Sequence, residues 1–255
     1  MKISKIFLYD EPSVPELKIS ELAQFIKDTF GINVETRKNI FQKSTEQIAE
    51  KIASCKIFNA RKPFEFHNTT KEEIAFELAT FSDSAKSENI VMYDGFEIQK
   101  IVNSLVSKEE SNHDQFHIVF TNKLTCTYDY NDYRFHGRAI ICSNPTIIST
   151  TGIIEAPAKP REYYLELISK MAQGLNVDSV KKKYQGTYLE YHDKRLSSIA
   201  EGYVIQGIFY YLTGEPFCEL LECRLNNAHW QKDLLYSQIE VGKLCKKHEK
   251  ILNDF

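Results

Sequence analysis

Four residues near the C-terminus combine metal-binding side chains with a regular spacing. Cys218 and Cys223 are separated by four residues, and Cys245 precedes His248 by three positions, so the pattern is C-x4-C…C-x2-H. A structural zinc ion takes four tetrahedral sulfur or nitrogen ligands, and three cysteines with one histidine are a usual set. Lysines around the second pair favour the thiolate form. The spacing therefore predicts one structural zinc ion, bound by these four residues within a zinc-binding segment, 214–250.

The alternative interpretation of this cluster is a group of buried free cysteines beside a surface histidine. Three of the six cysteines of the chain fall within one short segment, which favours the metal site. The other three, Cys55, Cys126 and Cys142, lie in apolar stretches typical of a protein core.

Three histidines outside the cluster are candidates for a catalytic role. His229 stands beside the only tryptophan of the chain and is predicted either to line a pocket or to cap the following helix. His136 belongs to a tyrosine-rich segment of mixed charge, 128–138. This segment is predicted either to bind a peptide or small anion or to be an edge strand kept soluble by its charges. His192 precedes a long helix, for which Asp193 is the predicted N-cap.

The elements that must position these residues follow from hydrophobic periodicity. Residues 4–9 read as a strand, 19–30 as a helix and 32–36 as a strand, which favours a parallel pair with a crossover helix. Further helices are predicted over 45–55, 70–81, 96–106, 161–173, 177–184, 193–212, 228–239 and 243–252. Further strands are predicted over 89–92, 116–121, 125–130 and 138–143, and residues 145–160 are predicted to be irregular extended chain.

The simplest reading is a single α/β domain, 1–255, with a mainly sheet-forming half, 1–150, and a mainly helical half, 151–255. Hydrophobic residues make up 42% of the chain, which is enough for a large core. The net charge of −3 gives no general attraction to nucleic acid or to an acidic membrane, so neither is an expected partner. There is neither a signal peptide nor an apolar run long enough to span a membrane, which predicts a cytoplasmic location.

The segment 207–248 resembles the archaemetzincins, which are zinc-dependent metallopeptidases. Their pattern is H-E-x-x-H-x-x-G-x-x-H-C, then x4-C, a methionine turn and C-x-x-C. With Cys218 on the first structural cysteine, the motif glycine falls on Gly214, and the methionine-turn position falls on Leu225. The remaining structural ligands fall on Cys223, Cys245 and His248. The segment 136–143, HGRAIICS, is similar to the strand that precedes the active-site helix of the family.

The catalytic positions of the motif are not retained. The three zinc-binding histidines fall on Gly207, Tyr211 and Phe217, and the catalytic glutamate falls on Ile208. These residues can neither hold a catalytic zinc ion nor act as a general base. The chain also resembles an uncharacterised archaeal family of metallopeptidase-like proteins that lacks this catalytic motif.

The resemblance implies a metzincin-like fold, with a mixed twisted sheet and a helical C-terminal half held by the structural zinc. It implies a catalytically inactive homologue that binds a peptide or protein in the remnant cleft. An alternative is an active hydrolase or peptidase with a relocated site that uses His136, His192 or His229. A zinc knuckle that binds nucleic acid is a third possibility, and the acidic net charge counts against it.

Overall fold

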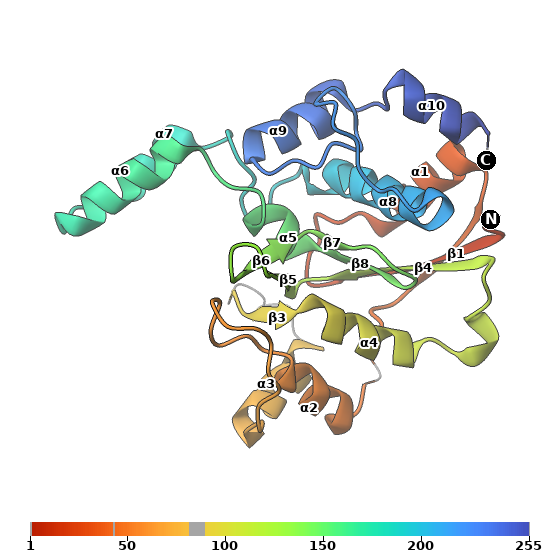
Figure 1. The fold of residues 1–255 in the computed structure, drawn as a ribbon, viewed down its shortest axis with the longest axis horizontal. Helices are drawn as coiled ribbons and strands as arrows, with labels where there is room; N and C mark the ends of the chain where they lie inside the picture. The colour runs from red at the N-terminus through yellow and green to blue at the C-terminus, as the bar shows by residue number, and fades with distance from the viewer. Residues whose placement is uncertain (1, 43, 82–89, 255) are drawn as a thin grey trace.

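The computed structural model describes residues 2–42, 44–81 and 90–254. The strands are β1 (Lys5–Tyr9), β2 (Asn33–Arg37), β3 (Met92–Asp94), β4 (Gln115–Thr121), β5 (Leu124–Asp129), β6 (Arg134–Arg138), β7 (Ile140–Ile141) and β8 (Thr146–Ser149). The helices are α1 (Ile19–Phe30), α2 (Glu46–Ser54), α3 (Lys71–Thr80), α4 (Gly95–Leu105), α5 (Thr150–Glu155), α6 (Arg161–Ala172), α7 (Asp178–Tyr184), α8 (Leu196–Thr213), α9 (Gln231–Leu235) and α10 (Lys246–Asn253). Helices lie on both sides of the strands (Figure 1).

Two sheets organise the fold, which is therefore of the mixed α/β class. The larger sheet has the strand order β2-β1-β4-β8-β7, and its first four strands run parallel. β1 pairs with β2 in parallel, with Lys5 opposite Asn33, so the predicted β-α-β opening is confirmed. β7 pairs antiparallel with β8 and forms one edge of this sheet. The smaller sheet has the order β3-β5-β6, which makes β6 an edge strand.

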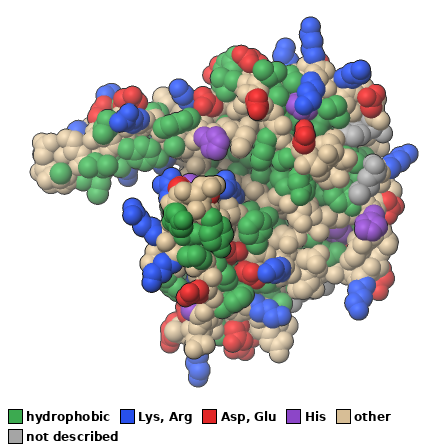
Figure 2. Space-filling view, viewed as in Figure 1, with side chains coloured by type: hydrophobic (Ala, Val, Ile, Leu, Met, Phe, Trp, Pro, Cys, Tyr) green, Lys and Arg blue, Asp and Glu red, His purple; other side chains and the backbone are tan. Residues whose placement is uncertain are grey.

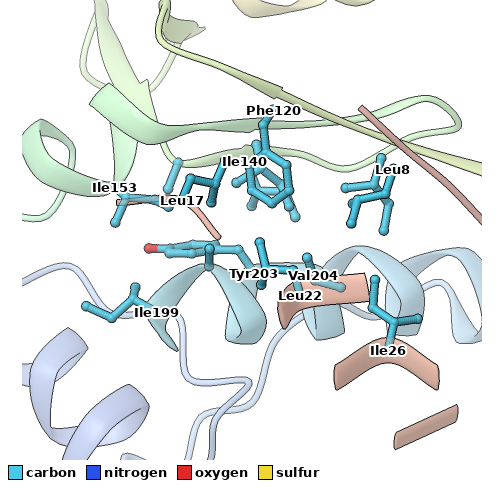
Figure 3. Packing of buried hydrophobic residues seen from close by; sticks show 14 of the residues in the cluster. Leu8, Leu17, Leu22, Ile26, Phe120, Ile140, Ile153, Ile199, Tyr203 and Val204 are labelled. Atoms are coloured by element: carbon cyan, nitrogen blue, oxygen red, sulfur yellow. The ribbon is translucent and has the colours of Figure 1, made fainter. Parts of the chain in front are cut away.

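Side chains that alternate along the buried strands form a separate hydrophobic cluster on each face of the larger sheet. Leu8 and Phe120 point toward α1 and α8, where they belong to one cluster with Leu22 and Val204 (Figure 3). Phe7, next to Leu8 in β1, belongs to the cluster on the opposite face, together with side chains of α2 and α4. The sheet therefore fixes α8 on one of its faces.

Several element ends follow capping signals in the sequence. α1 ends at Gly31, whose φ of 66° is a left-handed conformation that glycine adopts without strain. α3 begins with a capping box, in which the Glu73 N–H donates to the Thr70 hydroxyl and the Thr70 N–H donates to the Glu73 carboxylate. The start predicted at Thr70 is thereby confirmed.

The prediction of irregular chain over 145–160 is wrong for residues 146–155, because β8 and α5 occupy them. The Ser149 hydroxyl accepts the N–H of Gly152 at 2.7 Å and so caps α5. A Cβ atom at Gly152 would lie 2.1 Å from the carbonyl oxygen of Arg138, so this glycine allows α5 to pack directly on the end of β6. A strand of four residues and a helix of six are too short to display a period.

Other boundaries differ by a few residues. The predicted strand 138–143 is divided between the end of β6 and β7, and β3 starts at Met92 rather than at Asn89, which lies outside the described residues. The cap predicted at Asp193 is wrong: α8 starts at Leu196, and the Asp193 carboxylate accepts the N–H of Arg195 instead. The helix predicted over 228–239 consists of α9 followed by a π-helical turn, Tyr236–Val241.

α6 and α7 form an arm that projects from the body of the molecule (Figure 1). Tyr163 of α6 packs against Val180 of α7, and both are buried. Hydrophobic side chains also lie along the surface of this arm (Figure 2), among them Ile168 and Met171, each 63% exposed. None of the described helices is both long enough and apolar enough to cross a membrane.

Candidate metal centre and adjoining cavity

Cys218, Cys223, Cys245 and His248 lie together, and their four potential ligand atoms are all within 4.8 Å of one another. His248 Nδ1 lies 3.5 Å from Cys223 Sγ and 3.1 Å from Cys245 Sγ. Around a tetrahedral zinc ion with bonds of about 2.0–2.3 Å, neighbouring ligand atoms are roughly 3.3–3.8 Å apart. The 3.5 Å separation and the donor types fit such an ion, and small side-chain shifts would bring the other separations into this range. The sequence pattern selected the same four residues.

Two short segments position the four side chains. α8 ends at Gly214, in a left-handed conformation with φ 82°, and the chain then turns back over the helix. In the following loop, the Cys218 N–H donates to the carbonyl of Leu225 at 2.8 Å. Cys245 is the N-cap of α10, and His248 lies in the first turn of that helix. The cluster thus joins the loop after α8 to the last helix of the chain.

The electrostatic surroundings of the cluster differ among its members. Burial raises the pKa of the Cys223 thiol to about 12 and lowers the pKa of the His248 imidazole. Burial opposes ionisation of Cys245, but the His248 N–H and the neighbouring thiols outweigh it and hold the pKa of Cys245 below its usual value. Metal ligation requires thiolate and neutral imidazole, so a cation here would offset the cost of ionising buried Cys223.

A second group of potential ligands, Asp129, Asp132 and His136, lies at the turn between β5 and β6. Asp132 accepts hydrogen bonds from His136 Nε2 at 2.9 Å and from Arg134 Nε at 2.6 Å. These donors hold the pKa of Asp132 below its ordinary value, with His136 the larger cause. The position of β6 at the edge of its sheet agrees with the predicted role of these charges in an edge strand.

A cavity of about 400 Å³ adjoins the metal centre on the side of α8. Residues 137–142, which include the edge strand β7, form one wall of the cavity. Tyr203 and Gln206 of α8 also line the cavity, as do Phe217 and the segment 226–229. Phe217 is adjacent to Cys218 in the chain, so the loop that carries two cysteines of the cluster also forms part of this cavity.

The polar groups of the cavity are mostly neutral. Among the described residues that line it there is no aspartate or glutamate. Burial raises the pKa of Cys142 to about 12, so this thiol is protonated at neutral pH and is a poor nucleophile. Gln206 is 1% exposed, and its Nε2 donates to the carbonyl of Asn226 at 3.3 Å. Its Oε1 has no hydrogen-bond partner in the described parts of the chain.

The aligned catalytic positions are mostly remote from the cavity. Gly207 faces β8, because a Cβ atom there would lie 3.0 Å from Cγ2 of Thr146. Ile208 is fully buried in the hydrophobic cluster between α8 and the sheet. Tyr211 stacks on Phe116 of β4, with ring centroids 4.7 Å apart. Phe217 is the only one of the four aligned positions that lines the cavity.

The three candidate histidines have different surroundings. His229 lines the cavity, as one of its two predicted roles required, whereas the N-cap of the following helix is Trp230. His136 is paired with Asp132, and Nδ1 of His192 lies 3.1 Å from Oε1 of Glu16. His192 borders a different and much smaller cavity, of about 30 Å³.

Tyr203 and Gln206 were not predicted from the sequence as site residues. Burial raises the pKa of the Tyr203 phenol well above its usual value, so the hydroxyl stays neutral. The signal that was available for Gln206 is a single amide side chain in the otherwise apolar run YVIQGIFYY of α8. A polar residue in a buried helix needs a partner and so marks a site.

One comparison with known proteins gives a match over nearly the whole chain. Residues 2–255 match the family described as the probable metallopeptidase family, DUF6775. The chain belongs to this family. No curated protein and no solved structure matches the chain. Membership in this family and the cysteine–histidine cluster both point to a metal, so the cluster is the candidate metal site.

Proposed function

We propose that the protein is an archaemetzincin-like member of this family that has lost peptidase activity. It holds one structural zinc ion at Cys218, Cys223, Cys245 and His248, and it binds a peptide or an extended protein segment in the cavity beside α8. The observation that carries this proposal is the separation of the two sites. None of the four metal-binding side chains lines the cavity, and no described carboxylate does.

The composition of the cluster supports a structural rather than a catalytic metal. A catalytic zinc ion has about three protein ligands and keeps an open position for water. Here four protein side chains supply a complete tetrahedral set, two of them buried. A zinc ion held in this way contributes to folding and leaves no position at which water is activated.

The edge strand supports peptide binding. β7 pairs with β8 on one side, and among the described strands none pairs with its other side. The backbone run 137–142, with β7 inside it, lines the cavity. An extended peptide can add to such an edge through main-chain hydrogen bonds, with its side chains in the adjoining pocket.

An active hydrolase with a relocated site is the second candidate, because His229 lines the cavity. A histidine general base needs a second group that orients it or a nucleophile that it activates. In the cavity His229 is accompanied by protonated Cys142 and by neutral amides, which are poorly suited to either role. Peptide hydrolysis that is lost on His229→Ala and insensitive to chelators would favour this candidate over ours.

Metal analysis tests the structural zinc. We expect about one zinc per chain, and Cys223→Ser should abolish it and lower the melting temperature, because metal-binding energy is folding energy at such sites. Cys142→Ser is the matched control, since this half-buried cysteine lies outside the cluster and should leave the zinc content unchanged. A second tightly bound zinc ion, or chelator-sensitive cleavage of peptides, would contradict the proposal.

A further inference from the structure

Arg138 places a cationic side chain at the cavity. It is the last residue of β6 and lies two residues before the start of β7. Its Nε donates to the Thr127 hydroxyl at 2.7 Å, which holds the guanidinium against β5. Both Arg138 and Thr127 line the cavity. The side chain is half-buried, so solvent screens its charge only partly.

The other arginines that are not fully exposed all have a carboxylate partner. Arg37 pairs with Glu110, Arg195 with Asp193 and Arg224 with Glu201, at 2.6–2.7 Å. Arg138 forms no such pair with any described residue. A guanidinium withdrawn from water is unfavourable without an opposite charge, and its planar fork matches a carboxylate with two parallel hydrogen bonds. Arg138, the half-buried arginine without a carboxylate partner among the described residues, therefore lies at a cavity that has no acidic side chain among its described lining residues.

We propose that Arg138 is the anchor for a carboxylate of the peptide ligand. This inference rests on the proposed peptide-binding function and names the chemical class that the cavity selects. Gln206, Asn226 and His229 add neutral hydrogen-bonding groups to the same cavity. They can satisfy the peptide amides near the carboxylate without a competing negative charge.

The position of Arg138 next to β7 gives the carboxylate a place in the bound strand. A peptide that adds to β7 runs along Ile140 and Ile141, and Arg138 stands at one end of that path. The carboxylate can come from the C-terminus of the peptide or from an aspartate or glutamate side chain. Both sources offer the same two oxygens to the guanidinium, and an experiment can separate them.

The test uses four pools of octapeptides of otherwise random composition, each labelled at the N-terminus with a dansyl group, which carries no carboxylate. The pools combine a free or amidated C-terminus with the presence or absence of aspartate and glutamate. We expect the pool with neither carboxylate source to bind about tenfold more weakly than the best pool, since a charge-assisted pair to arginine is worth at least that factor. The pool with a single source that retains tight binding identifies the carboxylate.

Variants test the role of Arg138 itself. Arg138→Gln should reduce binding of the preferred pool to the level of the pool without carboxylates, and Arg138→Lys should restore it in part, because the charge remains but the fork is lost. Arg134→Gln is the matched control: the same charge is removed four residues away, at an exposed arginine paired with Asp132. Thermal melting of each variant separates loss of binding from loss of folding.

The outcomes distinguish this inference from the proposed function. Equal binding of all four pools, or a folded Arg138→Gln variant that binds the preferred pool like the wild type, overturns the role of Arg138 and leaves peptide binding intact. Failure of every pool to bind the zinc-loaded chain overturns both. Equal losses in Arg138→Gln and Arg134→Gln reduce the effect to general electrostatics and also overturn the specific anchor.

Discussion

His117 of β4 is the centre of a buried hydrogen-bond chain, and its ring stacks on Phe7, on the face of the larger sheet opposite α8. Its Nε2 donates to the carbonyl of Glu110 at 2.8 Å, and the Tyr9 hydroxyl donates to its Nδ1 at 3.2 Å. The hydroxyl of Tyr9 in turn accepts from Arg37 at 3.3 Å. In the neutral ring, both nitrogens have a hydrogen-bond partner. A second proton, on Nδ1, would remove the acceptor of the Tyr9 hydroxyl and break this hydrogen bond.

This network predicts a loss of stability in mild acid. Burial lowers the pKa of His117 below its ordinary value. As the pH falls below about 6.5, the unfolded chain therefore takes up a proton at this residue before the folded chain does. The free energy of unfolding should decrease from about pH 7.5 to about pH 5.5, as measured by urea denaturation.

His117→Gln is the matched variant, because glutamine can donate and accept hydrogen bonds but does not titrate in this range. We expect a smaller decrease in its unfolding free energy over the same pH interval. The difference between the two chains isolates His117 from acid effects at the metal cluster, which both chains share. Parallel pH profiles for the two chains would show that His117 does not contribute.

Residue types and spacing were sufficient to select the four members of the cysteine–histidine cluster, because a metal site needs specific donors at short spacings. They selected His229 as a candidate pocket residue but did not show which other residues meet at the cavity. Phe96, Arg138, Gln206 and His229 all line it but come from distant parts of the chain. A periodic pattern shows which face of an element is buried and not which faces meet, so Gln206 was overlooked.

At the scale of elements, α8 shows why restoration of two histidines would not restore a peptidase. Gly207 packs against Thr146 of β8, and Tyr211 donates its hydroxyl to the carbonyl of His113 at 2.6 Å. Both positions face the sheet, whereas Tyr203 and Gln206 reach the cavity. A metal bound at 207 and 211 would therefore lie in the hydrophobic core.

The double variant Gly207→His, Tyr211→His should be inactive and less stable. The larger side chain at 207 overpacks the contact with β8, which costs about 1–3 kcal/mol, and the hydrogen bond of Tyr211 is lost as well. Fluorogenic peptide cleavage and urea denaturation measure the two effects. Gly207→Ala is the control for size, since its Cβ atom meets Thr146 at a distance that a small shift relieves. A stable and proteolytic double variant would show that the helix is turned differently.

Two short elements that the sequence did not predict are β8 and α5. Long amphipathic helices such as α1 and α4 and the parallel pair β1–β2 were predicted close to their observed ends, because several turns or a full alternation carry the signal. β8 and α5 lie between Pro145 and Pro157. These prolines, together with Gly152, are residue types typical of loops, so the sequence predicted irregular chain here. The tertiary contact of Gly152 with β6 decides the local structure, and no local pattern contains it.

At the scale of the molecule, one buried carboxylate connects separate parts of the fold. Glu77 of α3 is fully buried and binds the ammonium groups of Lys56 at 3.1 Å and of Lys123 at 2.6 Å. The Tyr93 hydroxyl of β3 donates to the same carboxylate at 2.8 Å. Burial and the nearby Glu77 raise the pKa of Tyr93 well above its usual value, so it remains a donor. Glu77 thus joins α3 to β3 and to the turn between β4 and β5.

Glu77→Gln should destabilise the whole protein strongly. It leaves two ammonium groups buried without a counter-charge, and the removal of one partner from a buried ion pair typically costs about 3–5 kcal/mol. Urea denaturation measures the change. Glu97→Gln is the control, because its partner Lys100 is largely exposed, and exposed pairs contribute little to stability. Similar losses in the two variants would contradict the connecting role of Glu77.

The loop after α8 carries Cys218 and Cys223 and also supplies Phe217 and Asn226 to the cavity. Two ligands that act on one structural element are thermodynamically coupled, and the coupling is reciprocal. In the proposed function, a metal that fixes this loop presents a preformed wall to a peptide ligand. A peptide that binds better to the preformed wall must raise the affinity of the cluster for the metal by the same factor. A bound peptide would therefore slow the removal of the ion by competing chelators.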